Sequence, residues 1–292
     1  MVLLKTTSSL ALPAGYRVAD TLAFHGRDPE SPSERVAHGV LRKALWLGDR
    51  PRVMAVALEA QGAKARVEGG GAVPEATLRR LLGLHLDPDP FEARVRRDGL
   101  LGPLVKARPG LRVLLTATPF EALVWAILGQ QINLALAFRL RRRVIEAYGA
   151  EVGGLWAHPR PEDLAEADPE ALGQMQVSRA KAACLIALSG AVASGRLPLE
   201  DLASWDFAEA DARLRAEKGI GPWTSHYVLM RGLGLPDCVP VGDSALATAL
   251  ERGLGLASRP GPKEVERLMA PYAPHRSLAS FHLWAGLKGV PA

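Results

Sequence analysis

A tight glycine turn near residue 220 constrains the fold of this chain more than any other part of its sequence. The run Gly219–Trp223 separates two segments with helical spacing, and an isolated acid, Asp243, follows on the carboxyl side. Glycine accepts backbone conformations that a side chain forbids, and Pro222 suits a first helical turn, where its missing N–H is not needed. We therefore expect two helices joined by a hairpin. Its amides and the second helix N-terminus can bind an anion, such as a DNA phosphate, without reading sequence.

The composition fits a soluble globular protein with one large domain or two modest ones. The 292 residues are enough to bury a sizeable core. The 48% hydrophobic and 23% charged content is typical of a folded chain. No apolar run approaches the roughly 20 residues of a transmembrane helix. The short apolar run at the N-terminus precedes Lys5 instead of following it, so we do not expect a signal peptide.

The charge is mildly basic and the cysteine content is low. A net charge of +5 is compatible with a polyanionic partner. Four arginines on one predicted helix either contact phosphate or form a solvated face: Arg139, Arg141, Arg142 and Arg143. The two cysteines, Cys184 and Cys238, cannot make a four-cysteine zinc site or an iron–sulfur cluster. They also give no disulfide framework, which fits a reducing cytoplasm.

The pattern of the chain changes near residue 112. Before it, β-type runs on both sides of Gly48–Pro51 predict a hairpin, and a helix with apolar spacing starts at Pro74. After it, Thr118–Glu121 has the form of a capping box, and helical segments follow one another with short connections. We therefore expect an α+β chain, with an N-terminal antiparallel sheet/α domain over residues 1–112 and an all-α domain over 113–292.

The hairpin followed by Asp243 resembles the helix-hairpin-helix element and catalytic loop of the HhH-GPD DNA glycosylases. The stretch Ala126–Ile132 looks like a motif of the 3-methyladenine glycosylase II branch, and so do Ala107–Arg112 and Arg276–Trp284. The resemblance covers most of residues 100–288. It is weaker over the first hundred, where that branch carries a TATA-binding-protein-like domain. It implies a monofunctional enzyme that flips alkylated bases of the 3-methyladenine type from duplex DNA and hydrolyses the N-glycosidic bond, leaving an abasic site.

Asp243 is the residue that we expect to carry the chemistry. Cleavage of an N-glycosidic bond builds positive charge on the sugar, and a nearby carboxylate stabilises that charge or activates water. An alkylated purine is already a cationic leaving group, so a second acid is less necessary. The alternative is that Asp243 simply caps the apolar helix after it, and the two roles can coexist. Gly242 stands where the branch often has a second aspartate.

Trp223 occupies the place where the glycosylase/lyases of the superfamily carry a nucleophilic lysine. Tryptophan cannot form a Schiff base, so the resemblance implies a hydrolase. Lys218 precedes the hairpin glycines, where we expect it to face phosphate or solvent. Trp223 and Tyr227 share a helix face. With Trp284 and Phe24 they can wall a base pocket whose π faces attract a cation; the alternative for all four is ordinary core packing.

The remaining predicted contacts are with DNA. The resemblance places Gln130 or Gln131 at the gap left by a flipped base, whereas the alternative is an ordinary polar helix end. Main-chain and side-chain contacts to DNA are expected from the hairpin and its flanks: Lys218, Gly219, Ile220, Gly221 and Thr224. The partner would be double-stranded DNA containing alkylated bases. We expect no membrane partner, and a monomer in the cytoplasm at the nucleoid.

We expect no catalytic metal and no organic cofactor. His226 and His282 lack a partner at metal-ligand spacing and are predicted to be structural. The resemblance allows a potassium or sodium ion at the hairpin carbonyls. Two rival functions remain. An oxidised-base glycosylase/lyase is disfavoured by Trp223, and a non-catalytic DNA-binding module is disfavoured by Asp243 with its aromatic neighbours.

Overall fold

The computed structural model describes residues 7–287, so Lys5, used above against a signal peptide, lies outside them. The chain forms two compact units, each made of two stretches. The first combines Met1–Arg79 with Leu123–Leu199, and the second combines Arg80–Ala122 with Glu200–Ala292. Each unit thus draws on both sides of residue 112, and the predicted domains 1–112 and 113–292 stay a prediction.

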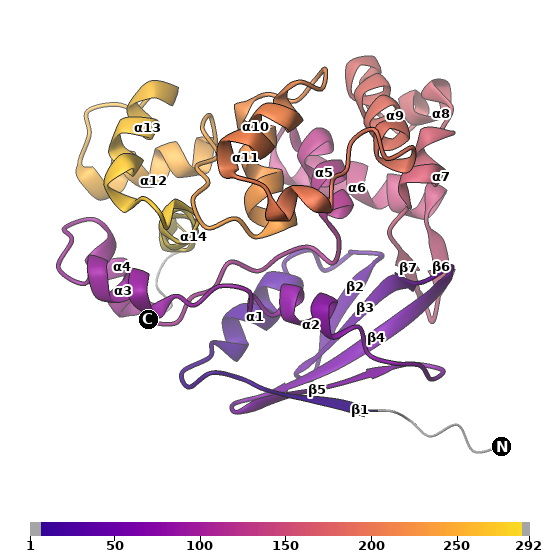
Figure 1. Cartoon of the computed structure of the whole chain (residues 1–292), viewed down its shortest axis with the longest axis horizontal. Helices are drawn as coiled ribbons and strands as arrows, with labels where there is room; N and C mark the ends of the chain where they lie inside the picture. Colours follow the sequence, from indigo (N-terminus) through magenta and orange to yellow (C-terminus); the bar gives the residue numbers. More distant parts are fainter. Residues whose placement is uncertain (1–6, 288–292) are drawn as a thin grey trace. The chain divides into compact units, whose positions relative to one another are not determined.

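A five-stranded antiparallel sheet of order β1-β5-β4-β3-β2 dominates the first part of the first unit (Figure 1). Its strands are β1 (Thr7–Ala11), β2 (Glu34–Ala37), β3 (Val40–Leu47), β4 (Arg50–Glu59) and β5 (Gly62–Val67). The predicted hairpin is confirmed as β3–β4. Its turn is shorter than expected, because Gly48 adopts φ +61° and Pro51 already pairs with Trp46 inside the ladder.

The two faces of this sheet are covered differently. Side chains that alternate along the strands, among them Leu41, Met54 and Val56, are fully buried on one face. On the other face Ala44 and Val53 pack against a short hairpin of β6 (Ala150–Val152) and β7 (Leu155–Ala157). Strands of three residues carry too little alternation to be seen in a sequence, so this hairpin was not predicted.

Helices complete the first unit, and most begin at the polar residue that the sequence offers. They are α1 (Val18–His25), α6 (Leu134–Tyr148), α7 (Pro161–Ala165), α8 (Pro169–Gln174) and α9 (Arg179–Ala193). Asn133, Asp168 and Ser178 accept a backbone N–H at the starts of α6, α8 and α9. The helices α2 (Glu75–Leu81) and α5 (Pro119–Gly129) connect the units. At the start of α5, Glu121 N–H donates to Thr118 Oγ1 at 3.2 Å, as the predicted capping box requires.

Three of the four arginines of α6, Arg141, Arg142 and Arg143, make contacts inside the first unit. Arg141 is 8% exposed and lies 3.7 Å from the carboxylate of Glu34. Arg142 lies 3.3 Å from Asp28. Both alternatives, a phosphate contact and a solvated face, are therefore wrong for Arg141, because its guanidinium is buried against an acid from the sheet. Arg139 is exposed and remains available to solvent.

The second unit is helical. Its elements are α3 (Asp89–Val95), α4 (Leu101–Ala107), η1 (Asp201–Ser204), α10 (Phe207–Arg215), α11 (Pro222–Val228), a π-helical turn η2 (Leu229–Leu233), α12 (Ser244–Leu254), α13 (Pro262–Met269), η3 (Ala270–Tyr272) and α14 (Arg276–Leu287). The mixed α+β class predicted from the sequence is confirmed. Within residues 7–287, no helix is long and apolar enough to cross a membrane.

Candidate active site

The two glycines of the hairpin between α10 and α11 have different roles. Gly219 allows the backbone to turn, and Gly221 leaves the main chain uncovered by a side chain. Gly219 has φ +93°, a backbone conformation that residues with a side chain rarely adopt. Ile220 is 6% exposed and anchors the turn, and its N–H donates to the carbonyl of Glu217 at 3.2 Å. Gly221 has φ −92°, and a Cβ there would meet nothing within 4 Å. The expectation that a tight backbone requires both glycines is therefore wrong for Gly221.

The residues predicted to contact DNA differ in what they can present. Lys218, Gly219 and Gly221 are exposed. Thr224 is 2% exposed, so its side chain points away from the surface, as does that of Ile220. Thr224 and Ile220 could therefore contact DNA only through their main-chain groups. The phosphate contacts themselves, and an ion at the hairpin carbonyls, stay predictions.

Asp243 stands at the junction of a loop and a helix. The chain turns at Gly242, with φ +91°, and Asp243 then becomes the N-cap of α12. Its Oδ1 accepts the N–H of Leu246 at 2.8 Å. The capping role proposed as an alternative is therefore real. It uses one face of one oxygen, and the carboxylate keeps other lone pairs for further contacts.

Two indole groups hold the same carboxylate from two different helices. Trp223, in the first turn of α11, donates its Nε1–H to Oδ2 of Asp243 at 3.1 Å. Trp284, on α14, donates its Nε1–H to Oδ1 at 3.0 Å. Hydrogen bonds to an ionised acceptor are the stronger kind and fix its orientation. The structure thus joins three of the sequence-predicted site residues, all of them partly exposed, in one cluster.

The aromatic faces near this carboxylate extend the cluster. The rings of Trp223 and Tyr227 stack, with centroids 5.4 Å apart and planes at 28°. On α14 the ring of Phe281 meets Trp284 edge-on, with centroids 5.9 Å apart. Trp223 and Tyr227 are half-buried and are not ordinary core residues. Their shared surface, with a carboxylate at its edge, suits a flat and positively charged ligand.

Gln130 and Gln131 lie in the first unit, after the end of α5. Gln131 is exposed and has φ +55°, an uncommon conformation for a residue other than glycine, asparagine or aspartate. The end of α5 is pinned, because Lys181 Nζ donates to the carbonyl of Leu128 at 2.7 Å. Residues held in such conformations are enriched at functional sites. The place of either glutamine in a DNA gap stays a prediction.

Phe24, near the end of α1, also belongs to the first unit. The guanidinium of Arg27 lies 3.8 Å from the centroid of its ring, so one face of the ring carries a cation from the protein itself. Its edge meets His25 in a T-shaped contact. Its predicted share in the base pocket stays a prediction.

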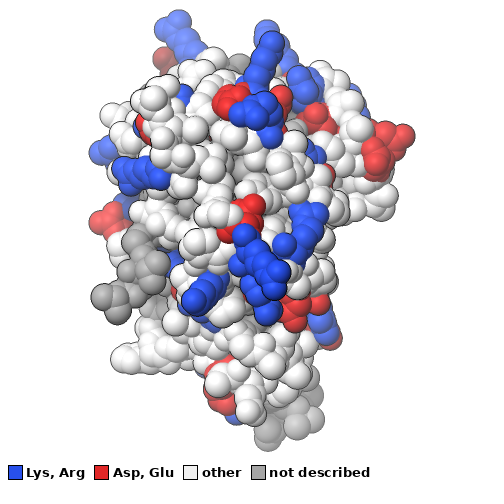
Figure 2. Space-filling model, turned by 90° about the vertical axis from the view of Figure 1, so that its left-hand side faces the viewer, with Lys and Arg blue, Asp and Glu red and all other residues white. Residues whose placement is uncertain are grey.

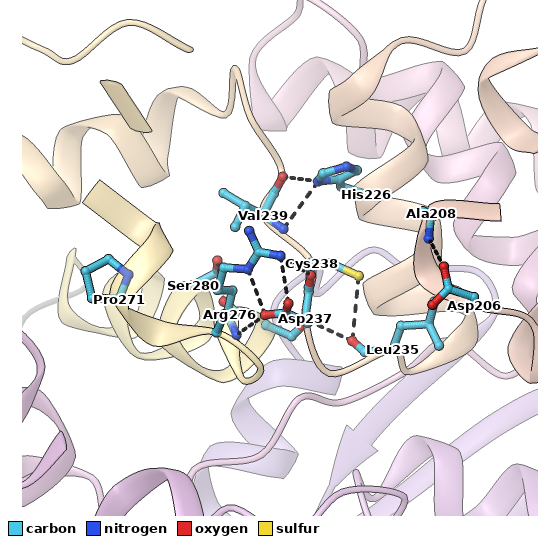
Figure 3. A network of polar contacts seen from close by, with 12 residues as sticks. Asp206, Ala208, His226, Leu235, Asp237, Cys238, Val239, Pro271, Arg276 and Ser280 are labelled. Atoms are coloured by element: carbon cyan, nitrogen blue, oxygen red, sulfur yellow. Dashed lines mark hydrogen bonds and ion pairs between the residues drawn. The ribbon is translucent and has the colours of Figure 1, made fainter. Parts of the chain in front are cut away.

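Two side chains that contact the loop before Asp243 are functional candidates that the sequence analysis missed. His226, taken as a structural histidine, contacts Val239, and Arg276 forms an ion pair with Asp237 (Figure 3). These pairs lie far apart in the chain and follow no spacing rule, so no sequence signal announced them. His282, the other predicted structural histidine, is 1% exposed beside Phe91.

Neither the face drawn in Figure 2 nor the described residues show a focus of positive charge or of metal-binding groups. On the face drawn in Figure 2, lysine and arginine side chains are interspersed with acidic ones, and positive charge forms no continuous band there. Among residues 7–287, no three histidine, cysteine or acidic side chains are grouped so that they could hold a metal ion.

Comparisons with known proteins show the family and the fold of this chain. The family model of the HhH-GPD superfamily base excision DNA repair protein matches residues 124–274. A DNA-3-methyladenine glycosylase of Bacillus subtilis is 34% identical over 205 residues, which span 69% of this chain and 68% of that protein. DNA-3-methyladenine glycosylase 2 of Escherichia coli is 33% identical over 72% of this chain and 70% of its own. The solved 3-methyladenine DNA-glycosylase from Archaeoglobus fulgidus has the same fold, with a TM-score of 0.85 over 97% of this chain and 98% of that one at 22% identity.

Proposed function

Because this chain belongs to the HhH-GPD superfamily of base excision DNA repair proteins, we propose that it is a monofunctional DNA glycosylase for alkylated bases. It extrudes a base of the 3-methyladenine type from duplex DNA, hydrolyses the N-glycosidic bond and leaves an abasic site. The observation that carries this proposal is the carboxylate of Asp243, held by the indoles of Trp223 and Trp284.

The chemical step follows from that geometry. The bond between C1′ and the base nitrogen breaks, and both electrons leave with the base. Because an alkylated purine is cationic, it departs as a neutral molecule, and positive charge develops on the sugar. The fixed carboxylate of Asp243 stabilises this charge in the transition state. A water molecule then adds to C1′ and gives up one proton to solvent, which leaves the hydroxyl of the abasic sugar. A fixed charge needs no reorganisation during the reaction. The two indole hydrogen bonds that fix the carboxylate therefore raise the rate of the chemical step.

Recognition of the base rests on the aromatic faces. The stacked pair Trp223 and Tyr227 offers an electron-rich surface, which binds a cationic ring more strongly than a neutral one. The indole N–H groups are engaged with Asp243. Stacking and charge therefore discriminate the damaged base more than hydrogen bonds from these side chains do.

Duplex DNA is the partner. The exposed hairpin around Gly219 and Gly221 contacts phosphate through its main chain, which holds the duplex in place without selecting sequence. Gln131 enters the gap that the extruded base leaves, and its amide hydrogen-bonds the orphaned base opposite. We further propose that the protein acts as a monomer in the cytoplasm, on nucleoid DNA, without an organic cofactor.

A nicking assay on a duplex with one alkylated base separates this function from its rivals. A hydrolase leaves an abasic site that breaks only when alkali is added, a lyase nicks without alkali, and a binding module does neither. We expect strand breaks only after alkali. Borohydride should trap no covalent complex, because Trp223 offers no amine. A trapped band that disappears in Lys218→Ala would assign the chain to the lyases.

The substrate range needs a second measurement. Randomly methylated DNA is incubated with the protein, and the released bases are separated and identified. Release of 3-methyladenine supports the proposed class. Release of 8-oxoguanine from oxidised DNA, with no release of methylated purines, would contradict it.

A further inference from the structure

The segment that precedes Asp243 in the chain has an irregular backbone. Residues 235–242, here called the support loop, connect the π turn η2 to the start of α12 and contain no helix or strand. The position of a catalytic carboxylate at the end of such a segment depends on the conformation of the loop that precedes it. Irregular backbone needs side-chain contacts to stay in one conformation.

The helix α14 binds the beginning of the support loop through hydrogen bonds and an ion pair. Arg276 forms a two-pronged ion pair with Asp237, with Nε to Oδ1 and Nη2 to Oδ2 both 2.7 Å. The main-chain N–H of Arg276 also donates to Oδ1 at 3.3 Å. Ser277 Oγ accepts the N–H of Cys238 at 3.0 Å and donates to the carbonyl of Leu235 at 2.7 Å. Burial opposes ionisation, but Arg276 holds the pKa of Asp237 below its usual range.

The helix α11 grips the middle of the same loop. Nδ1 of His226 contacts both main-chain polar groups of Val239, with the N–H of Val239 at 3.3 Å. Nε2 of His226 lies 3.6 Å from Asp211 on α10, and its ring meets Phe207 edge-on at 5.2 Å. Contacts with α10 therefore fix the orientation of the imidazole while Nδ1 faces the loop. In Figure 3 the support loop runs between His226 and Arg276.

Each of the two helices thus makes a second contact with the same segment. The helix α11 holds Val239 through His226 and Asp243 through Trp223. The helix α14 holds Asp237 through Arg276 and Asp243 through Trp284. A loop fixed at both its base and its end by the same two helices can place the carboxylate only where both contacts are satisfied.

We infer that His226 and Arg276 are positioning residues for Asp243, acting through the support loop. This inference rests on the proposed function, because it assumes that Asp243 carries the chemistry. Neither side chain need touch substrate. Their loss lets the loop shift, so that the carboxylate leaves the two indoles and the reacting sugar. Small displacements of reacting groups reduce rates by about a hundredfold.

The test compares rate with binding. In Arg276→Met and His226→Leu we expect the single-turnover excision rate to fall about 10- to 100-fold. The Kd for a duplex containing an uncleavable abasic analogue should stay within about threefold. Conservative variants should recover most of the rate. In His226→Asn the amide reaches the place of Nδ1, and Arg276→Lys keeps one ion pair with Asp237. The matched control is Arg267→Met, which removes an arginine–glutamate pair on α13 that does not contact the loop.

A second measurement needs no substrate. The chain has six tryptophans, whose indole N–H groups give separate signals in a ¹H–¹⁵N spectrum. Trp223→Phe and Trp284→Phe identify the two signals bonded to Asp243. We expect these two signals to move in Arg276→Met and Asp237→Asn, and the other four to stay. If a variant does not fold, Asp237→Asn and Arg276→Lys test the same contact.

The outcomes separate this inference from the proposed function. If Asp243→Asn excises normally, the proposed function itself fails. If Asp243→Asn is inactive while folded Arg276→Met and His226→Leu have the wild-type rate and unmoved indole signals, only the positioning role fails. A loss of rate that the conservative variants do not recover would also overturn it.

Discussion

Glu34, at the start of β2, and Arg141, in the middle of α6, form a buried ion pair, with Nη2 of Arg141 3.7 Å from Oε1 of Glu34. Lys43 Nζ lies 3.9 Å from Oε2 of the same carboxylate, and His25 Nδ1 lies 3.2 Å from it. All four residues are at most 8% exposed. One carboxylate therefore joins the sheet, α1 and α6 within the first unit.

Removal of that carboxylate should be costly. Glu34→Gln leaves Lys43 and Arg141 buried without their acid, and the loss of one partner of a buried pair costs about 3–5 kcal/mol. We expect a lower free energy of unfolding by chemical denaturation at pH 7. As a control, Glu59→Gln removes the exposed partner of Lys64 and should change stability by less than about 1 kcal/mol. An unchanged midpoint in Glu34→Gln would contradict this view of the cluster.

The same residue makes stability depend on pH. Burial alone would raise the pKa of Glu34, but Lys43, His25 and Arg141 hold it well below its ordinary value of 4.5. A lowered folded pKa means that the stabilisation is complete above pH 4.5 and is lost as the pH falls toward the folded pKa. The difference in unfolding free energy between wild type and Glu34→Gln should therefore shrink below about pH 4.5. A difference that stays constant from pH 7 to pH 3 would be inconsistent with it.

Asp243→Asn should abolish base excision and spare the fold. Asparagine is as good an N-cap as aspartate, so the contact with Leu246 at the start of α12 can be kept. The negative charge is lost, and the single-turnover rate should fall by about a hundredfold or more. The Kd for duplex DNA should change little, because the residue acts in the transition state. Asp206→Asn, at the start of α10, changes an N-cap of the same type and serves as the control.

Gly221→Leu should weaken binding to any duplex, whether damaged or not. A Cβ at this position meets no protein atom, so the fold should persist while a bulky side chain covers the main chain that faces phosphate. Gly261→Leu is a close control, since this glycine also precedes a proline at a helix start and also has open space. Affinities are compared at one salt concentration. Equal affinity of both variants and wild type would leave the hairpin as a structural turn.

Gln131→Gly should separate stability from activity. Glycine adopts φ +55° freely, whereas other residues incur about 1–2 kcal/mol. Thermal stability should stay equal or rise, and excision from duplex DNA should fall because the amide is gone. Excision from single-stranded DNA, which has no orphaned base to contact, should fall much less. Gln176→Gly replaces another exposed glutamine with positive φ and should leave excision unchanged.

Local signals explain what the sequence could predict. The hairpin at Gly219, the capping of α5 by Thr118 and the β3–β4 turn each depend on residues a few positions apart, and all appear in the structure. The family pattern predicted Trp223 in a base pocket and Asp243 as the catalytic acid. The bond of each indole to a separate carboxylate oxygen was not predicted, because it depends on the relative placement of α11, α12 and α14.

Long-range partners explain what the sequence could not predict. The acid that pairs with Arg141 comes from the sheet, and the acid that pairs with Arg276 comes from the support loop. In a sequence, a buried arginine looks like an exposed one until its partner is known. The same limit applies at Gly221. A sequence shows glycine both where the backbone is tight and where the surface must carry no side chain, and it does not distinguish the two reasons.

The double use of Asp243 has an evolutionary consequence. Groups selected for chemistry often weaken the fold, so stabilised variants tend to lose them. Here the same carboxylate that serves the reaction also caps α12 and binds two indoles. A library of this chain selected for heat resistance alone should therefore retain aspartate or asparagine at this position. Variants that retain aspartate should then keep repair activity that the selection never tested, whereas variants with asparagine should keep the helix cap alone.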